Sequence, residues 1–299
     1  MIDVSIIIVN YNTSALVNDA VASVFEKTEG ISYEIIIVDN ATENLSETIT
    51  AAGHESVRLL QLDENVGFGR ANNAGLQLAR GRNVLFLNPD TVLLNNAVAI
   101  LSRYLDENPA CGACGGNLYD ADMKPTRSFR RVYPTVESLV ATTFVGRRYE
   151  RWKSKGIISF NPTGKPLEVA YIVGADLMMR RKDLERYGSF SPDFFMYYEE
   201  IELCHRIHEA GFKVMSVPEA KIQHLEGKSG AMGTGKAAMH YRSSQTYFRK
   251  TLTEAGYARY RRALRFVIAT RLMAGKLTGR RNMTVYWGEW KRLFNEDKD

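Results

Sequence analysis

Cysteine is scarce in this chain, with three residues in 299. Cys111 and Cys114 form a C-x-x-C pair, but no second pair of Cys or His follows at the spacing of a zinc site. We interpret the pair as part of a buried, glycine-rich strand, and a metal or redox role is the alternative. So few cysteines, without a secretory signal, indicate a reducing compartment and no structural disulfides.

Long hydrophobic runs are also absent. No run reaches the ~18 apolar residues that a membrane-spanning helix needs. Residues 1–12 have a strand pattern with no basic segment before it, so we expect no signal peptide and a cytoplasmic protein. The apolar share of 45% is enough for a sizeable core, and 299 residues can form one large domain or one and a half domains of average size.

The first 90 residues alternate between strand and helix patterns. Residues 4–9 are a continuous run rich in β-branched residues, which is typical of a strand buried on both faces. Such an alternation predicts an α/β protein with a parallel, doubly wound sheet. The expected strands are 4–9, 33–40, 57–62 and 83–90, and the expected helices are 16–25, 45–52 and 69–79.

Beyond residue 110 the pattern becomes less regular, and a basic, irregular segment covers residues 127–165. Gly211 is expected to end a helix, because glycine is common directly after the last helical turn. From about residue 237 the chain is expected to be helical to its end. The other expected elements are strands 112–120, 168–181, 213–217 and 220–225 and a helix over 199–210.

Polar residues follow the ends of several expected strands, where ligands of parallel sheets bind. Asn10, Asp39, Glu64 and Asp90 lie at or just past these ends. Asp90 can bind a divalent cation that bridges a diphosphate, and a turn after Pro89 is the alternative. Asp39 can accept an N–H from a nucleotide base or cap the next helix.

Two adjacent carboxylates, Glu199 and Glu200, follow an aromatic run at residues 194–198. Apolar surroundings raise the pKa of a carboxyl, which can then act as a general base near neutral pH. The alternative is an acidic helix N-terminus, which the helix dipole favours. His224 precedes a glycine-rich segment, and a structural role is the alternative for this lone histidine.

Two glycine-rich segments imitate nucleotide-binding motifs without completing them. Residues 67–75 have Asn72 where the dinucleotide fingerprint needs its third glycine. Residues 230–237 have Ala237 in place of the Ser or Thr of a P-loop. We therefore expect neither a dinucleotide enzyme nor a P-loop NTPase, and a loop over a phosphate-bearing ligand fits residues 230–237 equally well.

Positive charge is concentrated at the C-terminal end. Residues 241–299 hold 14 Lys and Arg against 5 Asp and Glu, a net charge of +9, whereas residues 1–240 carry −4. A helical apolar stripe beside arginines predicts binding to an anionic membrane surface. The alternative is a helical cap that packs on the rest of the chain or on a second subunit in a homodimer. No nucleic-acid-binding fold accompanies the charge, so no nucleic-acid partner is expected. The stripe consists of Leu264, Val267, Ile268 and Met273, beside Arg261, Arg262, Arg265 and Arg271.

Six motifs follow one another over about residues 3–230: VSIIIVNYN, VDNAT, NVGFGRANNAG, LNPDT, YIVGADLMMRR and FFMYYEEIELCHR. In this order they resemble the motifs of glycosyltransferase family 2, inverting enzymes with the GT-A fold. LNPDT stands where that family has its metal-binding DxD motif, and FFMYYEEIELCHR resembles the ED-containing start of a helix. The motifs are most similar to those of bacterial rhamnosyltransferases, which build cell-surface polysaccharides from dTDP-rhamnose.

The resemblance implies a role for each matching position. Glu200, where the family usually has Asp, is implied to be the catalytic base. Asp90 and His224 are implied to be ligands of Mg²⁺ or Mn²⁺ on the donor's diphosphate. Asp39 is implied to contact the pyrimidine base, and Asp176 the donor or acceptor sugar. The implied substrate-binding residues are Asn10, Asp39, Asn65, Gly67, Arg70, Asn88, Asp176 and Glu199.

The implied fold is a Rossmann-like, mostly parallel sheet flanked by helices in a catalytic domain over residues 1–236. Within it, residues 1–110 are the nucleotide-sugar-binding half and residues 111–236 the acceptor half, and residues 237–299 are a basic helical extension. The chain departs from the family at Asn88, which replaces the first Asp of DxD. An amide is a poorer ligand for a hard cation, so Asp90 is expected to contribute more of the metal-binding affinity.

The implied function is metal-dependent, inverting transfer of a sugar from a nucleotide-diphosphate donor. The sugar is L-rhamnose from dTDP-rhamnose, and the acceptor is a saccharide or a polyprenyl-diphosphate-linked glycolipid. Such an enzyme acts in the cytoplasm, peripherally at the inner face of the cell membrane. The sequence contains no Ser-His-Asp or Cys-His arrangement, which agrees with a single displacement without a covalent intermediate. A non-catalytic homologue that binds nucleotide sugars or glycans is the alternative.

Overall fold

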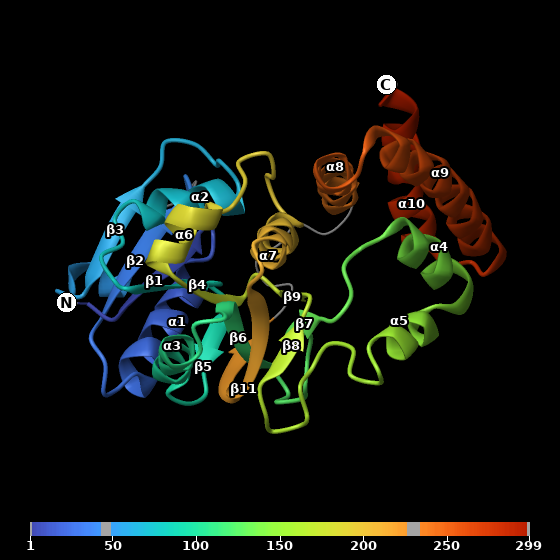
Figure 1. Cartoon of the computed structure of the whole chain (residues 1–299). Coiled ribbons are helices and arrows are strands. Elements are labelled where there is room, and N and C mark those ends of the chain that lie inside the picture. Colours follow the sequence, from blue (N-terminus) through green and yellow to red (C-terminus); the bar gives the residue numbers. More distant parts are fainter. Residues whose placement is uncertain (1, 43–48, 226–233, 298–299) are drawn as a thin grey trace. The chain divides into compact units, whose positions relative to one another are not determined.

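The computed structural model of the chain describes residues 2–42, 49–225 and 234–297 (Figure 1). The chain forms two compact units. The sheet unit consists of Met1–Arg131, Ile157–Pro192 and Glu199–Ser229, and the helical unit of Val132–Gly156, Asp193–Tyr198 and Gly230–Asp299.

The first half of the sheet unit has the strands that the apolar runs predict. Four parallel strands lie in the order β3-β2-β1-β4. All seven residues of β1 are buried, which confirms that this strand is covered on both faces. The strands are β1 (Val4–Asn10), β2 (Tyr33–Asp39), β3 (Val57–Gln61) and β4 (Asn83–Leu87).

The second half of the sheet is mixed, whereas the parallel arrangement predicted from the first 90 residues holds for β1 to β4. The order continues β4-β10-β6-β11-β5, with β8 beside β11, and β7 pairs with β9 in a separate small sheet. The contacts of β4 with β10, β10 with β6, β11 with β5 and β11 with β8 are all antiparallel. These strands are β5 (Thr91–Leu93), β6 (Cys111–Tyr119), β7 (Phe129–Arg130), β8 (Leu167–Val169), β9 (Tyr171–Ile172), β10 (Asp176–Arg180) and β11 (Lys213–His224).

Two strand predictions differ from the structure. The single strand expected over 168–181 is three strands, β8, β9 and β10, because each pairs with a different neighbour and the chain must turn between them. The two strands expected over 213–217 and 220–225 are one strand, β11, whose register against β6 shifts between Ser216 and Lys221. Pro218 lies in this irregular stretch, where its missing N–H costs no ladder hydrogen bond.

Helices cover both faces of the sheet, and each face has its own core (Figure 1). Ile6 and Ile8 pack with α1 and α3 on one face, whereas Ile7 and Val9 pack with α2, α6 and α7 on the other. This alternation follows from the two-residue period of a strand. The helices are α1 (Ser14–Lys27), α2 (Phe68–Leu76), α3 (Ala97–Glu107), α6 (Arg181–Tyr187) and α7 (Glu199–Glu209).

The helix expected over residues 45–52 is only partly testable, because residues 43–48 lie outside the described part of the chain. The part that is described forms a short 3₁₀ helix, η1 (Thr50–Gly53). It ends at the glycine, which has a low helix propensity.

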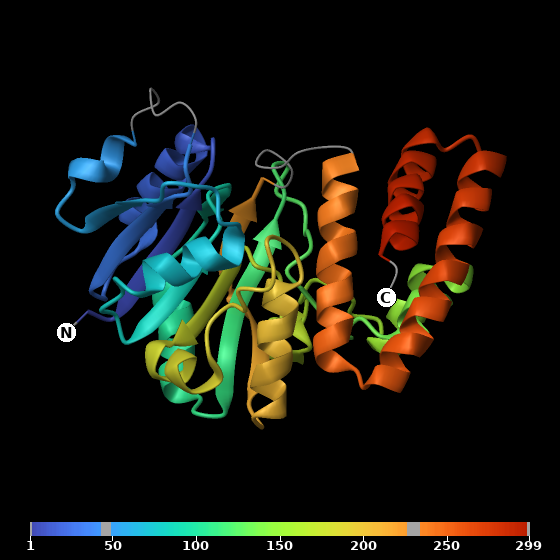
Figure 2. The ribbon, with the colours of Figure 1, turned by 90° about the horizontal axis from the view of Figure 1, so that it is seen from above.

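The helical unit contains α8 (Thr234–Thr251), α9 (Glu254–Leu277) and α10 (Arg281–Glu296), which confirms a helical C-terminal end. Figure 2 shows these three helices beside one another. The segment expected to be irregular over 127–165 in fact contains two helices of this unit, α4 (Val136–Val145) and α5 (Arg147–Lys153). A capping box between Thr135 and Ser138 starts α4.

Buried aromatic side chains hold the helical unit together. Phe248 of α8 stacks on Tyr260 of α9 with ring centroids 4.0 Å apart, and Tyr241 meets Trp290 of α10 edge to face at 5.4 Å. Arg261 binds the Asp297 carboxylate at 3.1 Å. Among the helices of the described residues, none combines the length and the apolar character that crossing a membrane requires.

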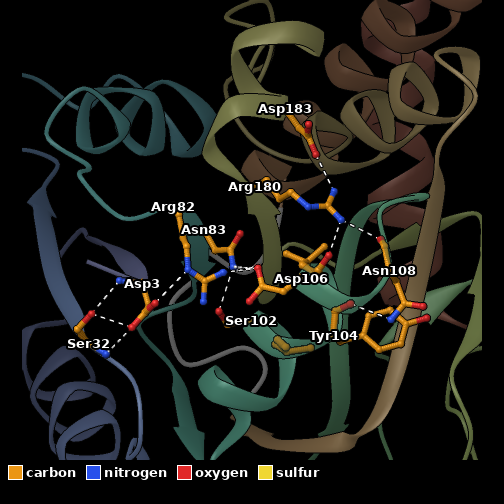
Figure 3. Close-up of polar contacts among 12 residues, drawn as sticks. Asp3, Ser32, Arg82, Asn83, Ser102, Tyr104, Asp106, Asn108, Arg180 and Asp183 are labelled. Carbon is orange, nitrogen blue, oxygen red and sulfur yellow. Dashed lines mark hydrogen bonds and ion pairs between the residues drawn. The ribbon is translucent and has the colours of Figure 1, made fainter. Parts of the chain in front are cut away.

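Polar side chains tie α3 to the sheet at the edge opposite the strand ends discussed below (Figure 3). Arg82 lies between Asp3 and Asp106 and bonds to both carboxylates. Arg180 of β10 bonds to Asp183 at 2.8 Å and to the backbone oxygens of Leu105 and Asn108. These carbonyls lie at the end of α3, where a helix leaves its last oxygens without partners.

A second buried ionic cluster centres on Glu34 of β2. Its side chain is 3% exposed and accepts hydrogen bonds from Ser5 (2.6 Å), Arg58 (2.7 Å) and the backbone and side chain of Arg80. Burial opposes the charge, but the hydrogen bonds from Ser5 and Arg80 and the charge of Arg58 hold the pKa of Glu34 below its usual value. The charged form therefore joins β1, β2 and β3 to the turn before β4.

Replacing Glu34 with Gln should lower the free energy of unfolding near neutral pH by about 2–4 kcal/mol, because several charge-assisted hydrogen bonds are lost at once. The difference should shrink as the pH falls through the lowered pKa of Glu34, where the native carboxylate is protonated. Urea titration measures both. Glu26→Gln, at a surface pair with Lys27, is the matched control and should cost less than about 1 kcal/mol. Equal costs for the two variants would contradict the role of Glu34.

Candidate active site

Most of the predicted polar residues lie at the carboxyl edge of β2, β1 and β4, whereas Glu64, which follows β3, is exposed. Asn10 and Asp39 are register partners at the ends of β1 and β2, and both are fully buried. The Asn10 Nδ2 atom donates to Asp39 Oδ1 at 2.8 Å and to Thr42 Oγ1 at 3.1 Å. Thr42 in turn donates to Asp39 through its hydroxyl. The Asp39 carboxylate therefore fixes the loop that follows β2.

The loop before α2 is held by a pair of amides. Asn40 Nδ2 donates to Asn65 Oδ1 at 2.9 Å, and this oxygen also accepts the Gly67 N–H at 3.0 Å. Gly67 has φ +87° at the start of α2, a conformation that L-residues rarely adopt. Arg70, on the first turn of α2, donates to the backbone oxygen of Pro192 at 2.8 Å. Of the predicted positions, Asn65 and Gly67 shape the loop, and Arg70 holds the segment at Pro192.

Asn88, Asp90 and His224 form a compact polar group just past β4. His224, the last residue of β11, is the register partner of Thr91. Its Nε2 atom lies 3.3 Å from Asp90 Oδ1 and 3.4 Å from Asn88 Nδ2. Asp90 and His224 are largely buried, with side chains 2% and 12% exposed. The structure thus brings together the two predicted metal ligands and the amide that departs from the family motif.

This group fits a divalent cation held jointly with a ligand. Asn88 Oδ1 and His224 Nδ1 are buried without a hydrogen-bond partner among the described residues, which is costly unless another group binds there. One carboxylate, one imidazole and one amide are suitable donors for Mg²⁺ or Mn²⁺. In the described part of the chain, no three His, Cys, Asp or Glu gather as a metal site. Substrate oxygens and water can supply further ligands.

Asp176 lies beside this group at the start of β10. It is the register partner of Leu87 at the end of β4, and the Asn88 N–H donates to the neighbouring Ala175 oxygen at 2.9 Å. Asp176 is fully buried, and its Oδ1 atom has no hydrogen-bond partner among the described residues. Burial raises the pKa of Asp176 well above its usual range, although the Gly116 N–H bonded to Oδ2 opposes the shift. The protonated form, which burial favours, can donate a hydrogen bond.

Glu199 and Glu200 begin α7 and have different neighbours. A Cβ atom placed on Gly69 would lie 3.7 Å from the Cβ of Glu199, so Glu199 faces α2. A Cβ atom on Gly174 would lie 3.8 Å from the Cβ of Glu200, so Glu200 faces the turn that leads to Asp176. Adjacent in sequence, the two carboxyls therefore occupy different environments.

Their acidities reflect these positions. Burial, together with the neighbouring Glu200 charge, raises the pKa of Glu199 well above its usual value. Burial also raises the pKa of Glu200, to about 7, although its own N–H, the N–H of Ile201 and the charge of Arg127 act in the opposite direction. A half-buried carboxyl that titrates near pH 7 can accept a proton from a substrate and return it to solvent.

Four residues that contribute to this edge were not among the predicted site residues. Asn40 and Thr42 hold the loop after β2, Gly174 leaves space beside Glu200, and Arg127 acts on its charge. Thr42 and Gly174 occur inside the motifs VDNAT and YIVGADLMMRR, which could have identified them. Arg127 has no local sequence signal, because only the fold brings it near α7.

The C-x-x-C pair and the first glycine-rich segment, to which no catalytic role was given, lie in regular secondary structure. Cys111 and Cys114 are buried in β6, which confirms the strand interpretation, and burial raises the pKa of Cys114 well above its usual value. Residues 67–75 form the start and body of α2. Residues 230–233 of the second glycine-rich segment lie outside the described residues, and α8 begins at Thr234.

The fold is similar to those of two solved enzymes. The mannosyltransferase PcManGT from Pyrobaculum calidifontis, in complex with GDP-Man and Mn²⁺, matches with a TM-score of 0.61 and 16% identity, over 99% of this chain and 88% of its own. GalNAc-T7 with UDP, GalNAc and Mn²⁺ matches with a TM-score of 0.59 and 17% identity, over 82% of this chain and 47% of its own. The expected GT-A fold is confirmed.

Sequence comparison gives a relative and a family. The chain is 25% identical over 264 residues to an N-acetylglucosaminyl-diphospho-decaprenol L-rhamnosyltransferase of Mycobacterium tuberculosis (strain CDC 1551 / Oshkosh), covering 81% of this chain and 82% of the relative. The family description "Glycosyl transferase family 2" matches residues 5–188, from β1 to the glycine after α6. Because this match spans more than half of the 299 residues, the chain belongs to glycosyl transferase family 2.

Proposed function

We propose that this glycosyltransferase moves L-rhamnose from dTDP-rhamnose, with inversion and with the help of a divalent metal, to a saccharide carried on a polyprenyl diphosphate. The observation that carries the catalytic part is Glu200, a half-buried carboxyl with a pKa of about 7 beside the turn to Asp176. The sugar and the acceptor are supported by the similarity to the mycobacterial rhamnosyltransferase. Such a reaction serves cell-surface polysaccharide synthesis at the cytoplasmic face of the membrane.

In the proposed reaction, Glu200 takes the proton of an acceptor hydroxyl. The acceptor oxygen forms a bond to the anomeric carbon, and the bond from that carbon to the diphosphate oxygen breaks, with its electron pair leaving on dTDP. Attack from the face opposite the nucleotide inverts the anomeric centre. Glu200 then gives the proton to solvent, and its pKa near 7 suits both directions of transfer.

Asp90 and His224 would hold the metal, with Asn88 beside them. When bound, Mg²⁺ or Mn²⁺ takes up negative charge on the departing diphosphate. Asp90 brings the hard anionic ligand, and the neutral imidazole of His224 keeps the total negative charge of the site low. The buried oxygen of Asn88 can accept a hydrogen bond from the donor or a water, which would satisfy it.

The other edge residues position the donor in this proposal. Asn10 and Thr42 hold the Asp39 carboxylate at the loop where a pyrimidine base would bind. Asn65 and Gly67 shape the adjacent loop. Arg70 belongs to α2, which follows this loop, and Glu199 faces α2. Asp176, whose protonated form burial favours by raising its pKa, would donate a hydrogen bond to a sugar hydroxyl. The division into a donor half, residues 1–110, an acceptor half, 111–236, and a basic extension, 237–299, is part of the same proposal.

A non-catalytic nucleotide-sugar- or glycan-binding protein is the competing function. A protein that only binds sugars has no use for a carboxyl that titrates near neutral pH, and burying it costs stability. The tuned pKa of Glu200 therefore favours the enzyme. Homodimer formation stays a prediction of the sequence.

Replacing Glu200 with Gln should reduce kcat at least about a hundredfold, because the amide keeps the size but accepts no proton. Binding of dTDP, measured by calorimetry, should be unchanged. Glu199→Gln should reduce kcat much less, since burial disfavours the charged form of Glu199, raising its pKa, and its side chain faces α2. Glu209→Gln, at the exposed end of α7, is the control. If Glu199→Gln is inactive and Glu200→Gln turns over normally, the base has been assigned to the wrong carboxyl.

The pH dependence follows from the same group. Since the base form exists above its pKa, kcat/KM should rise about tenfold per pH unit below pH 7 and level off above it. Removing the Arg127 charge in Arg127→Gln should move the midpoint to higher pH, because the positive charge favours the carboxylate. Arg103→Gln on α3, on the opposite face of the sheet, is the control and should not move it. An unchanged midpoint in Arg127→Gln would show that Arg127 does not influence the pKa of Glu200.

The donor and the metal are tested together. Purified protein should transfer sugar from dTDP-rhamnose to a short-chain, soluble diphospho-N-acetylglucosamine lipid analogue in preference to UDP-glucose or GDP-mannose. EDTA should stop the reaction and Mn²⁺ should restore it. Asp90→Asn should weaken Mn²⁺-dependent dTDP binding at least about tenfold, and His224→Ala should do so less. The exposed Asp122→Asn is the control. Full activity in EDTA would exclude the metal role, and preference for another donor would exclude rhamnose.

A further inference from the structure

Large apolar side chains are exposed mainly on the helical unit. Of the eleven exposed among the described residues, seven lie on α4, α5, α9 and α10. The two most exposed are Leu277 at 80% and Trp152 at 71%. Clusters of this kind on a folded unit mark an interaction surface. The seven are Phe144, Val145, Trp152, Phe266, Met273, Leu277 and Val285.

Helix α9 has two faces with apolar residues, one buried and one exposed. Tyr260, Leu264, Val267 and Ile268 are buried in the helical unit. Three of these four belong to the stripe that the sequence predicted to enter a membrane, so in this fold they pack internally instead. Another face, at spacings of three and four residues, is exposed. It consists of Arg262, Phe266, Ala269, Met273, Lys276 and Leu277.

Helix α4 extends this exposed face. The rings of Phe144 and Phe266 lie 5.9 Å apart by their centroids, and both are exposed. Arg271 of α9 donates to the Thr142 oxygen of α4 at 3.0 Å, which holds the two helices together (Figure 1). Phe144, Val145, Phe266, Met273 and Leu277 are called the α4–α9 patch below. Two elements distant in the sequence thus form one apolar surface.

Basic residues accompany the α4–α9 patch. Residues 147–155, which include α5 directly after α4, contain five Lys or Arg and one Glu. Trp152 of this segment carries Lys153 over its ring at 5.0 Å. On the exposed face of α9, Arg262 and Lys276 are the basic residues. A Trp beside Lys, next to exposed apolar residues, is the composition of a membrane–water interface.

We propose that the α4–α9 patch and the basic helix α5 dock the protein on an anionic phospholipid membrane. The apolar side chains would enter the headgroup region, and the Lys and Arg side chains would lie at lipid phosphates. A second copy of the chain is a poorer occupant, because two surfaces of the same positive charge repel each other. The docking itself does not depend on the proposed function. Its biological role does, because docking would bring the protein to a lipid-carried acceptor.

Vesicle flotation without donor or acceptor tests the docking. The protein should float with vesicles of phosphatidylcholine mixed with phosphatidylglycerol and should stay unbound with phosphatidylcholine alone. Binding should fall at about 1 M salt, where charges are screened within about 3 Å. The triple variant Phe144→Ala, Trp152→Ala, Leu277→Ala should bind at least about tenfold more weakly, since three apolar groups no longer leave water. The double variant Leu59→Ala, Met123→Ala, at exposed apolar residues of the sheet unit, is the matched control.

Two further measurements complete the test. Circular dichroism should show the same helix content and melting temperature in the triple variant, and transfer to the soluble acceptor should be unchanged. If transfer is absent but docking occurs, the proposed reaction is wrong and the docking surface stands. Equal flotation of the triple variant and the control overturns the docking surface. The docking surface is also wrong if the original protein fails to bind vesicles but forms a dimer in light scattering, and the triple variant is a monomer.

Discussion

The sheet unit depends on the complete burial of β1. All seven residues from Val4 to Asn10 are buried, so both faces of the strand must be covered by helices. Inside such a strand a polar side chain is costly unless it is bonded, as Ser5 is to Glu34. Polar groups that remain available for a ligand can therefore occur only at the strand ends. This constraint gathers Asn10, Asp39 and Asn88 at one edge of the sheet.

The same cost of burial produces the chemistry at that edge. Asp176, Glu199 and Glu200 are carboxyls whose pKa values rise because low-dielectric surroundings disfavour their charged forms. The chain also holds Tyr197 and Tyr198 at φ +71° directly before α7, a conformation that bulky residues rarely adopt. Such a backbone fixes where the helix begins and so which carboxyl stands at each of its first positions.

Much of the fold could be predicted because its signals are local. The apolar run at residues 4–9 and the alternation that follows it identify β1 to β4, α1 and α2 with small shifts in their ends, whereas α3 was not predicted. Where partners are distant, prediction from the pattern failed. Residues 168–181 read as one strand but pair with β11, β7 and β4 in turn, and residues 127–165 read as irregular but hold α4 and α5. For the site, the strand-end position of Asp90 and the paired Glu199 and Glu200 were visible as motifs, and their roles stay predictions.

The sequence alone determined the fold class, the family and the positions of the candidate residues, because residue order and periodicity carry that information. Only the tertiary structure decided what surrounds them. It placed His224 3.3 Å from Asp90 across 134 positions of sequence and brought the charge of Arg127 to Glu200. It buried Asp176 with one oxygen that has no hydrogen-bond partner in the described part of the chain. It also buried Leu264, Val267 and Ile268 and exposed Phe266 and Leu277 on the same helix. Burial and pKa depend on which distant segments pack together, and no local pattern records that.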